Sequence, residues 1–230
     1  MKKRILITAF AILVATLPVV AGDVATFVDL GFSSDSAYFM FGQYGADQAT
    51  GKPYAETYIV DNGRNDFVAQ GVARKVYDAS LEPGLDGVGA FYTLFADQVP
   101  LSKKYRIDHL KPGRLLYVLL DGQEPPATLS FRDFKSGAAY EIALNQKTSE
   151  AKGGTSSSFG ISVSVKLGDG ATKRVTGGNP DIKRPGVKAY VIRRIIAAPD
   201  QKTLVFIVEK RMANGGDGGI RYMVEVLKLP

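Results

Sequence analysis

Two ten-residue stretches decide the fold of this chain: AAPDQKTLVF at residues 197–206 and FSSDSAYFMF at residues 32–41. Each has an aspartate, Asp200 or Asp35, a few residues before an apolar run. A turn aspartate accepts hydrogen bonds from the amides that follow it, and Pro199 presets the φ of its turn. A polar loop and a second apolar run follow in both places, at 220–226 and 54–60. The pattern predicts two β-hairpins of one design, one near each end of the chain.

Short runs rich in Val, Ile, Phe, Tyr and Leu recur along the chain, separated by Gly, Pro, Asp, Asn and Ser. This alternation is typical of many antiparallel strands. A third hairpin is expected where 129–134 turns at 135–137 into 138–144, with Gly137 supplying a positive φ. The predicted strands are 25–32, 37–43, 54–60, 66–69, 72–78, 114–120, 127–134, 138–145, 158–167, 171–177, 187–197, 203–211 and 219–228.

One stretch has helical rather than strand spacing. Val88, Phe91, Tyr92 and Phe95 recur at intervals of one helical face, which predicts a short helix over 86–97. We expect Pro100 to restart the chain, and 101–109 to form a second helical turn. The helical insert therefore lies near 86–105.

The strand pattern fits two architectures. One is an antiparallel β-sandwich. The other is a small, irregular propeller-like fold, because the segments at Asp35 and Asp200 resemble the repeats of propellers in extracytoplasmic bacterial proteins. That likeness covers about a quarter of the chain, and the sequence leaves both architectures open.

The first residues have the order of a bacterial signal peptide: the cations of 2–4, an apolar run over 5–20, and a small-residue cleavage motif. Cleavage is expected after Ala21, which divides the chain into a signal peptide, 1–21, and a single β-rich extracytoplasmic domain, 22–230. An uncleaved membrane anchor is the alternative reading. No later stretch is apolar enough to span a membrane. The chain has no cysteine, so its fold has no disulfide.

The formal net charge is +6, but three of these charges belong to Lys2, Lys3 and Arg4, so the mature chain carries about +3. This balance does not predict a nucleic-acid partner, and it leaves a mild preference for anionic surfaces. Basic pairs gather toward the C-terminus, at 173–174, 183–184, 193–194 and 210–211. Adjacent residues on a strand face opposite sides, so the pairs cannot all form one patch.

Five segments together resemble an uncharacterised bacterial family of predicted secreted proteins. They are 27–33 (FVDLGFS), 42–45 (GQYG), 58–61 (YIVD), 108–110 (DHL) and 112–117 (PGRLLY). The resemblance extends over nearly the whole mature chain and implies export and a single domain. It implies no activity, and therefore no catalytic or ligand-binding residue.

The residues do not spell out a reaction. His109 is the only histidine, which excludes a two-histidine metal site and leaves one possible base for a serine triad. No Gly-x-Ser-x-Gly motif is present, and the Asp- and Gly-rich loops lack the spacing of calcium ligands. The sequence therefore predicts no catalytic residue, no metal site and no cofactor.

We interpret the chain as a non-catalytic module that binds an envelope protein or an anionic envelope polymer. The candidate contact residues are His109, Tyr44, Tyr54 and Arg211, and the expected contact surface is the loops 42–53, 146–157 and 212–219. The tyrosines are chosen because each lies beside Gly or Pro, which favours exposure. The alternative is an envelope hydrolase whose site is assembled from distant residues, with His109 as its base.

Overall fold

The computed structural model describes residues 24–47, 50–82, 84–152, 154–213 and 219–229. The predicted signal peptide lies outside these residues. The described strands form three antiparallel sheets. The N-terminal sheet has the order β4-β3-β2-β1-β5, with β1 Thr26–Ser33, β2 Tyr38–Ala46, β3 Pro53–Asp61, β4 Asp66–Val76 and β5 Ile107–Asp108. The central sheet has the order β13-β12-β11-β6, with β6 Arg114–Val118, β11 Val187–Ala197, β12 Thr203–Met212 and β13 Ile220–Lys228. The outer sheet has the order β10-β9-β8-β7, with β7 Thr128–Arg132, β8 Ala139–Ala151, β9 Gly154–Lys166 and β10 Thr172–Pro185.

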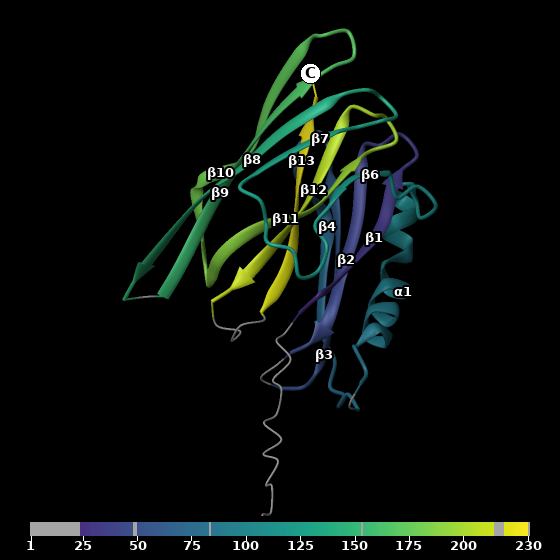
Figure 1. Ribbon diagram of the computed structural model, residues 1–230. Helices are drawn as coiled ribbons and strands as arrows, with labels where there is room; N and C mark the ends of the chain where they lie inside the picture. The colour runs from purple at the N-terminus through teal and green to yellow at the C-terminus, as the bar shows by residue number, and fades with distance from the viewer. Residues whose placement is uncertain (1–23, 48–49, 83, 153, 214–218, 230) are drawn as a thin grey trace, which may run out of the picture.

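The sheets stack in layers, from the outer sheet at the left of Figure 1 through the central and N-terminal sheets to helix α1, Val88–Lys104. One apolar core lies between the outer and central sheets, a second between the central and N-terminal sheets, and a third beneath α1. The central sheet is therefore covered on both faces. This explains why every residue of the run Leu204–Val208 is buried instead of alternating with exposed residues.

The mainly β prediction is confirmed, and the layers correspond to a β-sandwich extended by a third sheet. Two sheet-to-sheet cores join the layers in a line. A propeller instead arranges its sheets around an axis. Among the described residues the sandwich alternative is therefore the better description.

The two hairpins of one design are confirmed. Asp35 accepts a hydrogen bond from the Ala37 amide, and Asp200 accepts one from the Lys202 amide. The residue after each aspartate, Ser36 or Gln201, has a left-handed φ of 59° or 57°. The third hairpin is also present, and Gly137 has a φ of 72°. The predicted hairpins, β2–β3 and β12–β13, are both paired and lie in neighbouring layers.

Three local predictions are wrong. The runs 66–69 and 72–78 are one strand, β4, which stays paired past Gln70, where φ is 62°. The expected connector 146–157 is the paired end of β8 and β9, and its described residues match from Gln146↔Phe159 to Ala151↔Gly154. Pro100 lies inside α1 and does not end it. A proline within a helix costs about 3 kcal/mol, which the burial of Phe91 and Leu94 against the N-terminal sheet offsets.

Two glycines allow the N-terminal sheet and its neighbours to approach closely. A Cβ at Gly42 would lie 2.4 Å from the Phe91 ring of α1. Gly31 has a φ of 93°, and a Cβ there would lie 2.4 Å from the Asp108 carbonyl oxygen. Both belong to the segments that carry the family resemblance. These two glycines thus mark the junctions of β2 with α1 and of β1 with β5.

Amide side chains from the neighbouring layers satisfy backbone groups at both edges of the central sheet. Gln43 accepts a hydrogen bond from the Tyr222 amide at 2.7 Å and donates to its carbonyl oxygen at 3.3 Å. Gln146 does the same at Tyr190, accepting at 2.8 Å and donating at 3.3 Å. Unpaired strand edges invite association with other chains. Both glutamines therefore protect these edges and tie the layers together.

Candidate binding site

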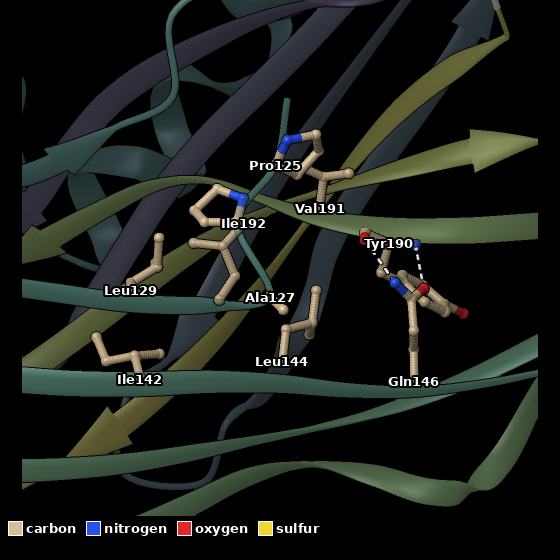
Figure 2. Close-up of a pocket in the computed structure, with 10 residues that line it drawn as sticks. Pro125, Ala127, Leu129, Ile142, Leu144, Gln146, Tyr190, Val191 and Ile192 are labelled. Atoms are coloured by element: carbon tan, nitrogen blue, oxygen red, sulfur yellow. Dashed lines mark hydrogen bonds between the residues drawn. The ribbon is translucent and has the colours of Figure 1, made fainter. Parts of the chain in front are cut away.

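An apolar pocket of about 270 Å³ opens between the outer and central sheets (Figure 2). It forms because β6 pairs only with Arg194–Ala197, so the first half of β11 has no strand partner on that side. The segment 125–127 and the inner face of the β7–β8 hairpin close the other walls. The lining residues are Pro125, Pro126, Ala127, Leu129, Ile142, Leu144, Gln146, Tyr190, Val191 and Ile192.

Gln146 is the polar side chain that shapes one end of this pocket. Figure 2 shows its amide aligned with the backbone of Tyr190, to which it donates one hydrogen bond and from which it accepts another. Tyr190 is the only titratable residue in the lining, and its hydroxyl donates to the Ser157 carbonyl oxygen at 3.0 Å. Burial raises the pKa of Tyr190. The pocket therefore combines apolar side chains with the polar Gln146, and its lining holds no acid–base pair.

The predicted exposure of Tyr44 and Tyr54 is wrong. Their exposed fractions are 8% and 4%. Tyr44 points to the helix side of the N-terminal sheet, where its hydroxyl lies 3.3 Å from Asp86 and its ring packs against Phe91. Tyr54 points to the central sheet, beneath the guanidinium of Arg221. A neighbouring glycine or proline does not expose these tyrosines because the sheet is covered on both faces.

His109 is exposed but anchored. Its Nδ1 lies 2.7 Å from the Leu30 carbonyl oxygen, and its Nε2 lies 3.3 Å from the Ser102 hydroxyl. The neighbouring Asp108 instead accepts a hydrogen bond from the Leu110 amide. Ser102 is 3% exposed, so a substrate has little access to its hydroxyl. This geometry fastens β5 to β1 and α1.

Arg211 is 40% exposed in its side chain and forms an ion pair with the buried Glu209 at 3.0 Å. Another of the basic pairs also has internal partners. Arg193 pairs with Asp121, while the neighbouring Arg194 lies over the Phe27 ring. Of the candidate contact residues, His109 and Arg211 thus have exposed atoms and internal partners, and the structure does not bring them together with the tyrosines at one site.

The predicted contact loops have different outcomes. The first is shorter than expected, because β2 and β3 extend to Ala46 and Pro53. The second is the paired β8–β9 hairpin described above. Most of the third, 214–218, lies outside the described residues. In the part of the chain that the structure describes, no cluster of three His, Asp or Glu could hold a metal ion, and no helix is long and apolar enough to cross a membrane.

Sequence reasoning missed the pocket because its walls look like ordinary core. Leu129, Ile142 and Ile192 fit the alternation of strand residues and give no separate signal. The one sequence cue is the pair Pro125-Pro126, which cannot donate backbone hydrogen bonds to the open edge of β11. Only the register of β6 on β11 leaves this edge open.

No curated protein matches the chain significantly. A family model described as "Predicted secreted protein (DUF2259)" matches residues 40–228 and thus confirms the resemblance found in the sequence. This match covers the outer and central sheets in full and most of the N-terminal sheet. The chain therefore belongs to the DUF2259 family of predicted secreted proteins.

Proposed function

We propose that this secreted-family protein is a non-catalytic binding module of the bacterial envelope, and that its pocket takes an apolar side chain from a protein partner. We further propose that a signal peptide is cleaved after Ala21, which N-terminal sequencing would test by a mature start at Gly22.

The observation that carries the proposal is the pocket itself. Aliphatic side chains line it next to the unpaired edge of β11, and the amide of Gln146 lies beside them. Binding sites for organic groups are typically concave and apolar with a few fixed polar groups. At about 270 Å³ the cavity accommodates one large side chain rather than a cofactor.

The hydrolase alternative has weaker support. A catalytic histidine must be oriented by a third group and must reach an accessible nucleophile. At His109 the orienting position is a backbone carbonyl, and the nearby Ser102 hydroxyl is buried. The anchoring contacts account for this histidine without a reaction.

The test is crosslinking in intact cells with three forms of the tagged protein, followed by mass spectrometry. Ala127→Trp fills the pocket from its rim, where Ala127 is exposed. Ala139→Trp is the matched control, because Ala139 is exposed on the opposite face of the same β7–β8 hairpin.

We expect one envelope protein to be recovered with the wild type and with Ala139→Trp, and to be lost with Ala127→Trp. Thermal unfolding of both variants checks that they fold. Equal recovery with Ala127→Trp, or no recovery with the wild type at several crosslinker lengths, would refute a protein partner at this pocket.

A further inference from the structure

Lys210 is paired with Tyr190 and lies within electrostatic reach of three arginines, Arg74, Arg184 and Arg221. Tyr190, Lys210 and Arg221 are direct partners in register across β11, β12 and β13. Directly opposed residues on antiparallel strands leave the sheet on one face, although the Arg221 guanidinium lies over the Tyr54 ring. Arg184 approaches from the outer sheet, with its guanidinium 5.9 Å from the Tyr190 ring and 5.4 Å from the Phe159 ring. Arg74 approaches from the N-terminal sheet. We call Arg74, Arg184, Lys210 and Arg221 the cation cluster.

The carboxylate that acts on Lys210 is that of Glu56, and it already has other partners. Glu56 accepts hydrogen bonds from Gln43 at 2.6 Å and from the Tyr58 hydroxyl at 2.5 Å. It also lies 3.7 Å from Arg74, whose Nε donates to Tyr58. Both hydrogen bonds use Oε2, and the single negative charge of Glu56 compensates Arg74.

Lys210 and Arg184 are not compensated in this way. Within the described part of the chain, neither forms an ion pair, and the Arg184 Nη1 is buried without an acceptor. Burial lowers the pKa of Lys210, and the charges of Arg74, Arg184 and Arg221 lower it further against the opposing effect of Glu56. A buried donor without an acceptor lowers the stability of the fold, as does a half-buried lysine near several arginines. A bound anion would remove both costs.

We propose that Lys210 and Arg184 form the centre of an oxyanion-binding site, flanked by Arg221 and Arg74, that takes a phosphate group. Phosphate fits because it offers several acceptor oxygens and more than one negative charge at neutral pH. Cation–π contacts with the Phe159 and Tyr190 rings hold the Arg184 guanidinium in place, and its buried Nη1 has no acceptor among the described residues. The site adjoins the apolar pocket at Tyr190, but none of its four cations lines that pocket.

The test uses inorganic phosphate and the purified full-length mature protein. Phosphate is expected to raise the melting temperature saturably, and sodium chloride at equal ionic strength is expected to have no such effect. Lys210→Met removes the central charge and should weaken phosphate binding by about tenfold or more, since hydrogen bonds to charged groups are the strong ones. Lys183→Met is the matched control, because Lys183 is exposed beside Arg184.

A second readout separates lost binding from lost folding. Without phosphate, Lys210→Met should melt at or above the wild-type temperature, because it removes an uncompensated cation. Sedimentation with phosphatidylglycerol vesicles then identifies the source of the phosphate group. If the wild type sediments with the vesicles and Lys210→Met does not, the ligand is a lipid headgroup. If the wild type binds inorganic phosphate but not the vesicles, the ligand is a soluble phosphate compound. Absence of any phosphate effect, or an equal effect in Lys210→Met, would overturn the proposal.

Discussion

Replacing Gln43 by leucine tests whether amide side chains hold the layers of this fold together. Gln43 is 1% exposed and connects β2 of the N-terminal sheet to the edge of β13. Leucine fits a similar volume but can neither donate nor accept. The substitution therefore removes the hydrogen bonds and leaves the packing nearly unchanged.

The expected loss of stability follows from the polar groups that lose a hydrogen-bond partner. The Tyr222 amide loses its acceptor at 2.7 Å, its carbonyl oxygen loses a weaker donor at 3.3 Å, and Glu56 loses a donor at 2.6 Å. A buried polar group without a partner costs about 1–3 kcal/mol. Glu56 keeps its contact with Tyr58, so we expect a total loss of about 3–4 kcal/mol, a large part of the typical stability of a domain.

Urea unfolding monitored by circular dichroism measures this loss, provided that the slope of the transition is unchanged. Gln98→Leu serves as the control, because Gln98 lies on α1 without a hydrogen-bond partner among the described residues, and it should shift stability by less than about 0.5 kcal/mol. A loss below about 1 kcal/mol for Gln43→Leu would show that the edge of β13 does not depend on this amide.

Three further substitutions have defined outcomes. Burial raises the pKa of Asp29 to about 6, so the folded state binds this proton more tightly than the unfolded state, and the stability of the fold falls as the pH rises from about 4 to about 6. In urea unfolding, Asp29→Asn should be more stable than wild type by up to about 3 kcal/mol at pH 7 and equal to it near pH 4. An Asp29→Asn protein that is less stable than wild type at pH 7 would contradict this. Hydrogen bonds from Arg114 hold the pKa of Asp133 well below its usual range, so this carboxylate stabilises the fold above about pH 4, and the stabilisation disappears as the pH falls through the folded pKa. Asp133→Asn should lower the free energy of unfolding by about 3 kcal/mol at pH 7, and the difference from wild type should become smaller in acid. A difference that does not change with pH would argue against the ion pair. His109→Ala should lower the free energy of unfolding by about 1–2 kcal/mol in the same assay, because only anchoring contacts are lost. The variant should retain its function in cells. A stable His109→Ala protein without cellular function would favour the hydrolase.

The sequence predicted most strands because their signals are local. The bounds of β11 match the expected range, 187–197, and the turns at Asp35 and Asp200 form as their side-chain chemistry requires. The helix near 86–105 was also predicted from spacing, but its continuity through Pro100 was not. That continuity depends on packing against the N-terminal sheet, which a window of sequence does not contain.

The sequence by itself determined the mainly β class, the hairpins and the family, because turn residues, strand alternation and family motifs lie along the chain. The tertiary structure alone decided the order of the layers and the burial of Tyr44 and Tyr54, because a residue beside glycine is exposed or buried according to what covers its sheet. It also decided both candidate sites. The pocket combines segments from 125 to 192 and exists only when the outer and central sheets pack, whereas the cation cluster takes residues from all three sheets.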